Sequence, residues 1–336
     1  ARYLSAGTHD PNLCCARCVK NTGSKPGRIL ITNEVSMKLY LAAVYTNNFT
    51  FESRGRVELN EGEKVHRKKL RYILESYHYV HRQRFVDTMR EDGVKVFLDS
   101  GAFSAFFGGV EIDIDAYCDY IKRNEDIVEV ASVLDGIGDP QKTYDNQTYM
   151  EAQDTRPLPC FHYGEDPRYL EHYVENYDYI TLGGMVPIST PQLRLWLDEI
   201  WEKYLTDSSG RAKLKVHGFG MTALPLMKRY PWHSVDSSSW VQIANFGNIL
   251  LPWNNQVLSV SDESPSLKEK GKHFSNLAPV QQDAVRERIE AQGFSMDRLA
   301  DNFVFRQVWN MYAFRDINER LEKKDATYKM TQETLF

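Results

Sequence analysis

Short runs of apolar and β-branched residues recur along the chain, and each run ends in a polar or glycine-rich turn. The runs lie at 28–32, 94–98, 128–134, 158–161, 179–182, 214–216, 234–235 and 248–251. Most are followed by residues with helical spacing, most clearly at 190–205. Eight strands that alternate with helices are the number that a parallel barrel needs, although a doubly wound open sheet has the same local pattern.

We therefore predict an α/β fold, a (β/α)8 TIM-type barrel with helical additions at its N-terminal and C-terminal ends. The barrel is expected to occupy residues 1–255 and to include a basic helical insertion near residues 60–90. Residues 256–336 are expected to form a loop and C-terminal helices that pack on the barrel. A length of 336 residues is normal for one barrel with insertions.

The bulk composition allows a folded protein without a membrane anchor. Hydrophobic residues make up 42% of the chain and charged residues 26%, so a sizeable core can form. No apolar stretch reaches the roughly 18–20 residues that cross a bilayer, and the first residues lack a signal-peptide pattern. We therefore expect a cytoplasmic protein; the sequence leaves open whether it is a monomer or a homodimer.

The residues that end the apolar runs carry the candidate chemistry. Six successive runs end in an ionisable side chain or in paired glycines. These end positions are Asp99, Asp135, His162, Gly183-Gly184-Met185, His217 and Asp236. A single aspartate after a strand is usually a helix cap or a turn former, but that explanation does not cover six ends comfortably. In a barrel these ends meet at one face, where the reaction site of this fold lies.

Several of these residue types suit a planar heterocycle as ligand. Phe103 can stack on a base, although ordinary helix packing explains it equally well. Gly183 and Gly184 let the backbone approach a flat ring closely. Carboxylates accept from the N–H groups of a guanine edge, and Asp135, with Asp139 close by, suits that task.

A basic segment at 64–84 is a candidate surface for nucleic acid. It contains seven lysines and arginines against one glutamate, together with three histidines and three tyrosines. The candidate phosphate contacts are Arg67, Lys68, Lys69, Arg71, Arg82 and Arg84. The alternative is the solvated face of an amphipathic helix, because Leu70, Ile73, Leu74 and Tyr77 follow helical spacing.

Cysteine usage gives only a weak metal signal. Five cysteines, an odd number, do not indicate a disulfide framework in a cytosolic protein. Cys14, Cys15 and Cys18 lie close together, so zinc binding there is one interpretation. No second C-x-x-C pair follows, and reduced thiols remain the other interpretation.

The strand-end motifs resemble those of the tRNA-guanine transglycosylase superfamily, most closely the DpdA-type 7-deazaguanine DNA transglycosylases of phages and bacteria. The matching motifs are FLDSGAFS, VLDGIGD, FHYGED, TLGGM, HGFGM and SVDSSSW. They occur in the family's order and cover residues 94–240. Each motif is weak alone, but six in order at six strand ends form a specific signal.

The resemblance implies a role for each matched residue. Asp236 matches the family's nucleophilic aspartate, and Asp99 matches the aspartate that carries a proton to and from the base. Asp135 matches a base-recognition aspartate, and His162 stands where many tRNA enzymes have glutamine. The remaining matches are Gly183 and Gly184 to the backbone donors for the purine carbonyl, and Phe103 to the stacking aromatic residue.

Two departures from the family pattern favour DNA over tRNA as substrate. The tRNA enzymes carry a cysteine-rich zinc insert after the nucleophile, but no cysteine follows Cys160 here. An arginine-rich stretch that follows the nucleophile in those enzymes is also missing, and SSSWVQIANFGN stands in its place. Whether Cys14, Cys15 and Cys18 replace the zinc site stays open.

The resemblance implies replacement of guanine in DNA by a free 7-deazaguanine base, with the 7-cyano form expected. Retention of configuration requires a covalent Asp236–deoxyribosyl intermediate, by the logic of a retaining glycosidase. The chemistry needs no cofactor, and the target guanine must be flipped out or single-stranded. The alternatives are a tRNA-guanine transglycosylase, a non-catalytic nucleic-acid-binding barrel, and a metal-dependent barrel hydrolase with His162 and His217 among its ligands.

Overall fold

The computed structural model describes residues 37–49, 57–269, 271–322 and 327–328. Eight parallel strands form one sheet in the order β4-β3-β2-β1-β8-β7-β6-β5. The strands are β1 (Lys38–Ala42), β2 (Ile73–Ser76), β3 (Val96–Asp99), β4 (Val128–Ala131), β5 (Cys160–His162), β6 (Tyr179–Gly183), β7 (Lys215–Gly218) and β8 (Ser234–Ser237). A parallel bridge between Ser132 and Leu158 links the β4 and β5 edges. The predicted α/β TIM-type fold is therefore confirmed.

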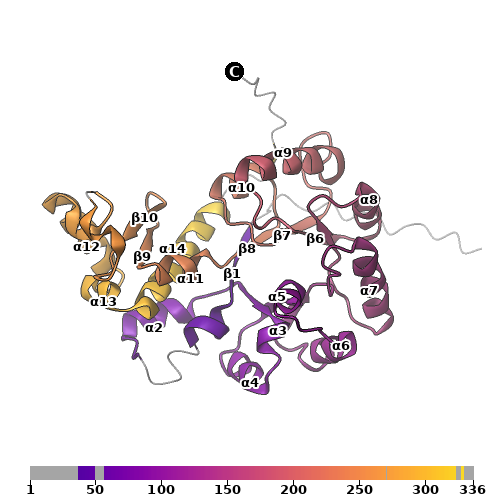
Figure 1. Cartoon of the computed structure of the whole chain (residues 1–336), viewed down its shortest axis with the longest axis horizontal. Coiled ribbons are helices and arrows are strands. Elements are labelled where there is room, and N and C mark those ends of the chain that lie inside the picture. The colour runs from indigo at the N-terminus through magenta and orange to yellow at the C-terminus, as the bar shows by residue number, and fades with distance from the viewer. Residues whose placement is uncertain (1–36, 50–56, 270, 323–326, 329–336) are drawn as a thin grey trace, which may run out of the picture. The chain divides into compact units, whose positions relative to one another are not determined.

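Helices alternate with the strands and, apart from α2, which packs against the C-terminal helix at 303–322, surround the sheet (Figure 1). They are α2 (Glu61–Lys68), α3 (Tyr77–Val80), α4 (Gln83–Glu91), α5 (Ala102–Phe107), α6 (Ile114–Arg123), α7 (Pro140–Ala152), α8 (Pro167–Asn176), α9 (Thr190–Ile200), α10 (Leu224–Arg229) and α11 (Ser239–Asn245). Short π-helical segments are η1 (Tyr45–Phe49) and η2 (Trp201–Leu205). The helices bury one large apolar cluster against the outer face of the strands. A small cluster of Tyr40, Ala42, Leu74 and Phe97 fills the inside.

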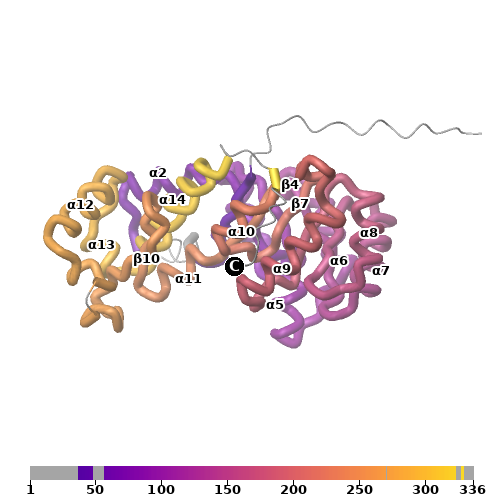
Figure 2. Tube along the Cα trace, turned by 90° about the horizontal axis from the view of Figure 1, so that it is seen from above, coloured from indigo at the N-terminus to yellow at the C-terminus, as the bar shows by residue number. Residues whose placement is uncertain are grey.

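A second apolar core follows the barrel in the sequence. Its elements are β9 (Asn248–Leu251), β10 (Gln256–Ser259), η3 (Pro265–Lys268), η4 (Phe274–Asn276), α12 (Pro279–Glu290), α13 (Met296–Asp301) and α14 (Phe303–Glu322). The first half of α14 packs in this core through Val304 and Trp309, and its second half packs in the barrel core through Phe314 and Ile317. Figure 2 shows α14 between α13 and the barrel. The helices at the C-terminal end are thus confirmed.

One of the eight strands predicted from the sequence is not a barrel strand. Another predicted strand, at residues 28–32, lies outside the described part of the chain. Residues 248–251 do form a strand, β9, but it pairs antiparallel with β10 in a separate hairpin. The expected border between residues 255 and 256 falls inside this hairpin. β1 and β2, which were not among the predicted strands, complete the eight-stranded sheet.

The expected basic helix at 64–84 is wrong in its middle. Ile73 and Leu74 belong to β2, which pairs with both β1 and β3. Ile73 faces the outer core and Leu74 the inner one, so both are buried for opposite reasons. A fully buried strand carries adjacent apolar residues, and within a basic stretch these imitate helical spacing.

Among the described residues, no helix has the length and apolar character needed to span a bilayer.

Candidate functional site

The structure brings the predicted strand-end residues to one end of the barrel. Asp99, His162 and Gly183 are the last residues of β3, β5 and β6. Asp135 follows β4 and the Ser132 bridge, and the remaining pair, His217 and Asp236, lies in β7 and β8. Since all eight strands are parallel, these positions share the carboxyl-end face, where barrel enzymes carry their reacting groups.

Asp99 is the residue whose electrostatic environment is most unusual. Burial raises its pKa from 3.8 to about 7, with further contributions from the charges of Asp135 and Asp236. Its Oδ2 accepts the backbone N–H of Gly101 at 3.0 Å. Gly101 has φ +79°, and a Cβ there would overlap Ser76 and His78, so this turn requires glycine. The carboxyl groups of Asp135 and Asp236 therefore both act on that of Asp99 at this end.

Asp236 is held from one side by two donors. The side chain is nearly buried, and its Oδ1 accepts the backbone N–H of Gly220 at 2.8 Å. His217 Nε2 lies 3.3 Å from the same oxygen. Gly220 ends the Gly-Phe-Gly turn after β7 with φ +63°, a conformation that side chains rarely adopt. The turn after β7 thus positions the carboxyl group of β8.

His217 begins a chain of hydrogen bonds that runs back through the barrel. Its Nδ1 lies 2.8 Å from Ser234 Oγ, and Ser234 Oγ lies 2.7 Å from the hydroxyl of Tyr179. The imidazole is fully buried and contacts the Phe97 ring at a centroid distance of 4.4 Å. Burial lowers the pKa of His217, which favours the neutral ring. A neutral His217 can donate to Asp236 only through Nε2 while Nδ1 accepts from Ser234.

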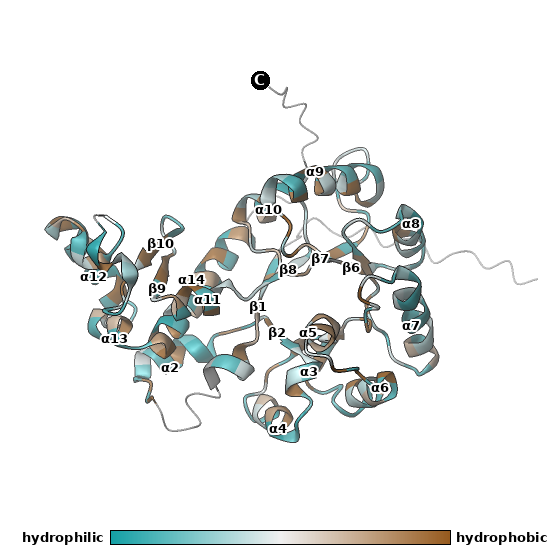
Figure 3. Cartoon of the chain, in the orientation of Figure 1, coloured by the Kyte–Doolittle hydropathy of each residue, from teal (hydrophilic) through white to brown (hydrophobic). Residues whose placement is uncertain are grey.

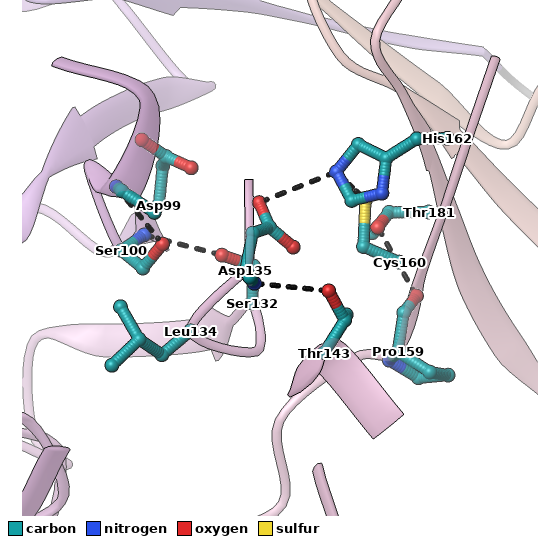
Figure 4. Close-up of polar contacts among 12 residues, drawn as sticks. Asp99, Ser100, Ser132, Leu134, Asp135, Thr143, Pro159, Cys160, His162 and Thr181 are labelled. Atoms are coloured by element: carbon teal, nitrogen blue, oxygen red, sulfur yellow. Dashed lines mark hydrogen bonds and ion pairs between the residues drawn. The ribbon is translucent and has the colours of Figure 1, made fainter. Parts of the chain in front are cut away.

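A second polar cluster lies at the ends of β4 and β5 (Figure 4). His162 Nε2 is 3.6 Å from Asp135 Oδ2 and 3.5 Å from Cys160 Sγ. Glu165 Oε1 lies 3.0 Å from His162 Nδ1, and Glu165 Oε2 accepts the His162 backbone N–H. Burial and then Asp135 raise the pKa of Cys160 to about 11. Burial alone lowers the pKa of His162, but Cys160 and Asp135 raise it above its usual range.

The other predicted base-binding residues differ in their placement. Met185 is buried in the barrel core, whereas Gly184 is exposed and has φ +68°. Asp139 caps α7 by accepting the Lys142 backbone N–H at 3.0 Å, so the structure gives it a helix-capping role. Phe103 is 56% exposed on α5, a strongly hydrophobic helix in Figure 3. Exposed Phe106 and Phe107 accompany it, so Phe103 is not ordinary core.

The structure does not bring the six predicted phosphate contacts together. Arg67, Lys68, Lys69 and Arg71 precede β2 at its amino end, whereas Arg82 and Arg84 follow it on the carboxyl-end side. Burial lowers the pKa of Arg67, which lies near Asp92 and Tyr45. Arg82 and Arg84 line a cleft of about 540 Å³ with Tyr77, Tyr79, His78 and other residues. Of the six predicted contacts, only Arg82 and Arg84 follow β2 on the side of its carboxyl end.

Four residues with close contacts in the site were missed by sequence reasoning: Cys160, Glu165, Tyr179 and Ser234. Cys160 and His162 are two positions apart in β5, and so are Ser234 and Asp236 in β8. A polar-apolar-polar triplet at the end of a predicted strand could have indicated them, because alternate residues share a face. Cys14, Cys15 and Cys18, the tentative zinc ligands, lie outside the described residues.

Comparison of the sequence with protein-family models found no match. Comparison with curated proteins likewise found no similar sequence. The function must therefore be argued from the geometry of the site and from the strand-end motifs.

Proposed function

We propose that this chain replaces guanine in DNA with a 7-deazaguanine base, with Asp236 as nucleophile and Asp99 as proton carrier. One observation carries the proposal: at one end of the barrel, burial and then the charges of Asp135 and Asp236 raise the pKa of Asp99 to about 7. A carboxyl group with that pKa can both donate and accept a proton near neutral pH. The strand-end motifs that resemble guanine transglycosylases lend independent support.

The first half-reaction removes guanine. Asp236 attacks C1′ of the target deoxyribose, an ester bond forms between C1′ and the carboxylate oxygen, and the C1′–N9 bond breaks. Asp99 enters this step protonated and transfers its proton to the departing base. A second carboxyl group that supplies the proton while the first forms the covalent bond is the arrangement of a retaining glycosidase.

The second half-reaction restores the enzyme. The incoming 7-deazaguanine loses the proton on N9 to Asp99, and N9 attacks the same carbon. The ester bond breaks and Asp236 leaves as a carboxylate. Two inversions at C1′ retain the configuration of the nucleoside, and the proton given up in the first step is recovered, so no cofactor takes part in the balance.

The contacts of Asp236 favour one oxygen as the nucleophile. Both Gly220 N–H and His217 Nε2 meet Oδ1. We therefore assign Oδ2 as the attacking atom and Oδ1 as the oxygen that fixes the rotamer of the side chain. His217 acts as a positioning residue. Ser234 contacts Nδ1 of the His217 ring and so keeps Nε2–H directed at Asp236.

The opposite wall, at the ends of β4 to β6, is the proposed base-recognition surface. Asp135 Oδ1 is buried without a hydrogen-bond partner among the described residues and is an acceptor for the N–H groups of a guanine edge. His162, Gly183 and Gly184 border the same wall. Phe103 on α5 is the proposed stacking residue for the flipped nucleotide.

The polynucleotide is proposed to approach from the carboxyl-end side. Arg82 and Arg84 are exposed in a cleft that also contains tyrosine side chains, a combination that suits phosphates and unstacked bases. Replacing both arginines with alanine is expected to weaken binding of single-stranded DNA and to reduce its salt dependence. Lys68→Ala/Lys69→Ala is the matched control, since these exposed residues precede β2 and should contribute little. Equal effects of the two double variants would contradict the proposed approach.

The exchange reaction itself can be tested with labelled base. Purified protein is incubated with DNA or with tRNA and 7-cyano-7-deazaguanine, and the nucleosides are measured by mass spectrometry. We expect incorporation into DNA; incorporation into tRNA alone would select the tRNA enzyme, and incorporation into neither would overturn the proposal. DNA binding without incorporation would instead indicate a non-catalytic barrel.

The roles of the two aspartates need separate variants. Asp236→Ala and Asp236→Asn should abolish both exchange and the trapped DNA–protein adduct, and Asp99→Ala should leave folding intact but stop turnover. Asp139→Asn is the control, because its exposed carboxyl group caps α7 and lies in the same loop as Asp135. Near-normal exchange by Asp236→Asn would remove the nucleophile assignment.

A further inference from the structure

We propose that Asp135, Cys160 and His162 bind a divalent zinc-type ion at the ends of β4 and β5. One ligand atom from each residue lies within 4.8 Å of the other two. Thiolate, imidazole and carboxylate together form a donor set that suits zinc among the common biological ions. The three ligands are other residues than Cys14, Cys15 and Cys18, and they come from strand ends.

Two of the three ligand-to-ligand distances in the cluster match the edges of a coordination tetrahedron. With zinc bonds of about 2.3 Å to sulfur and about 2.05 Å to nitrogen, a tetrahedral ion separates those two atoms by about 3.6 Å. The nitrogen and a carboxylate oxygen would be about 3.4 Å apart. The observed separations are 3.5 Å from Cys160 Sγ to His162 Nε2 and 3.6 Å from His162 Nε2 to Asp135 Oδ2. The second distance is too long for an ordinary hydrogen bond.

The cluster contains a buried acceptor without a partner. Asp135 Oδ1 is inaccessible to solvent and accepts no hydrogen bond from the described residues. The Asp135 side chain is only 12% exposed and that of His162 only 18%, while Cys160 is buried. Leaving a buried carboxylate oxygen unsatisfied is costly, and a cation bound to the same carboxyl group through Oδ2 offsets part of that cost. Figure 4 shows the Asp135 carboxyl group directed toward His162.

Glu165 provides the support that a metal-binding histidine usually has. Its Oε1 lies 3.0 Å from His162 Nδ1, so Nδ1 carries the proton and donates it. A metal ion binds the neutral ring, in which His162 Nε2 then has the free lone pair, and Nε2 is the atom that faces Asp135 and Cys160. A carboxylate that fixes the tautomer and orientation of a ligand histidine is typical of zinc sites.

Gly183 in β6 gives the cluster its room. A Cβ at this position would lie 2.8 Å from His162 Cδ2 and 3.0 Å from Cys160 Sγ. Any larger residue would therefore move two of the three ligands. The backbone of Gly183 has an ordinary φ, so the glycine is needed here for space.

Three protein ligands leave a tetrahedral ion one open coordination position, as in catalytic zinc sites. We assign that position to a heteroatom of the bound base, an assignment that rests on the proposed base exchange. Asp135 and His162 would then recognise the base through the ion. Ion binding itself does not depend on the reaction. The competing arrangement is a metal-free cluster with a His162 imidazolium between Glu165 and Asp135.

The test measures metal in a chain whose N-terminal cysteines are removed. The Cys14→Ser/Cys15→Ser/Cys18→Ser variant is purified after growth with zinc, and its metal content is measured by mass spectrometry; we expect about one ion per chain. Cobalt substitution should add a thiolate-to-cobalt charge-transfer band in the near-ultraviolet. Adding Cys160→Ser should remove that band and lower zinc content roughly tenfold or more. Cys118→Ser, at the other buried thiol among the described residues, is the matched control and should change neither.

The two proposals fail in distinguishable ways. If the triple-serine chain binds neither zinc nor cobalt stoichiometrically, or keeps the charge-transfer band with Cys160→Ser, the metal site is overturned. If the chain binds the ion but DNA acquires no labelled base, the site stands and the exchange activity fails. Full exchange by chelator-treated protein without residual metal would remove the ion from base recognition.

Discussion

Replacing Asp99 with asparagine should stabilise the protein at alkaline pH while it destroys the proposed proton carrier. The substitution keeps the size of the side chain and an oxygen that accepts the Gly101 N–H. It removes a carboxyl group whose ionisation is opposed first by burial and then by Asp135 and Asp236. A functional residue of this kind lowers the stability of the native state, so its loss should be visible in unfolding measurements without any substrate.

The sign and size follow from the raised pKa. The pKa of Asp99 is 3.8 ordinarily and about 7 in the folded protein. Between these values the native state binds more protons than the unfolded chain, so stability falls as pH rises and levels off above pH ~7. At about 1.4 kcal/mol per pKa unit the full loss is roughly 4 kcal/mol, of which about 3 kcal/mol develops between pH 5 and pH 8. Asp99→Asn should lack this loss.

Urea unfolding at pH 5 and pH 8 measures the effect. Divalent ions are removed with a chelator, since a cation beside Asp135 would offset the repulsion. The wild-type chain should lose about 2–3 kcal/mol more stability than Asp99→Asn between these pH values. Asp283→Asn on α12, an exposed carboxyl group, serves as control and should follow the wild-type chain. Identical pH dependence of Asp99→Asn and the wild-type chain would refute the buried, charge-coupled environment of Asp99.

Other contacts predict effects of different kinds. His217→Leu removes the side-chain donor to Asp236, so single-turnover adduct formation should slow roughly tenfold or more while DNA affinity stays unchanged; an unaltered rate would contradict its positioning role. Gly183→Ala crowds Cys160 and His162, so cobalt or zinc binding should fall, at a stability cost of about 1–3 kcal/mol in urea unfolding. Glu63→Gln leaves Arg298, its partner in a 2.6 Å ion pair, without a compensating negative charge. The free energy of unfolding in the same assay should fall by about 2–3 kcal/mol.

The sequence pattern predicts the fold class because most strands are short apolar runs that end in a recognisable polar or glycine-rich turn. Six of the eight barrel strands, β3 to β8, correspond to predicted runs. β1 and β2 were missed because the sequence KLYLA lacks a distinctive end, and β2 lies inside a basic stretch with apparent helical spacing. Residues 248–251 were misassigned to the barrel since a hairpin strand and a barrel strand look alike locally. The strands with which a run pairs decide whether it belongs to a hairpin or to the barrel. One short run of sequence does not show which strands those are.

The basic segment shows how one strand changes a functional interpretation. As a single helix, residues 64–84 would present their lysines and arginines on one surface. With β2 in the middle, the segment crosses the barrel wall, and its two halves lie at opposite ends of that strand. The sequence therefore gives the number of basic residues in the segment. Where their charges lie in the folded protein depends on the pairing of β2 with strands from distant segments. Of the six predicted phosphate contacts, only Arg82 and Arg84 lie after β2, where they line a cleft with Tyr77 and Tyr79.

The partners of the site residues follow a rule that local sequence shows only in part. Along a strand, residues two apart share a face, so Ser234 lies below Asp236, and Cys160 below His162, in successive layers. Polar side chains in such layers are costly unless each finds a partner on a neighbouring strand. Ser234 meets His217, and Cys160 meets His162. The polar-apolar-polar triplet thus indicates where polar site residues replace apolar side chains inside a barrel. Which of these residues contact one another depends on the register between strands, and that register is set only in the assembled barrel.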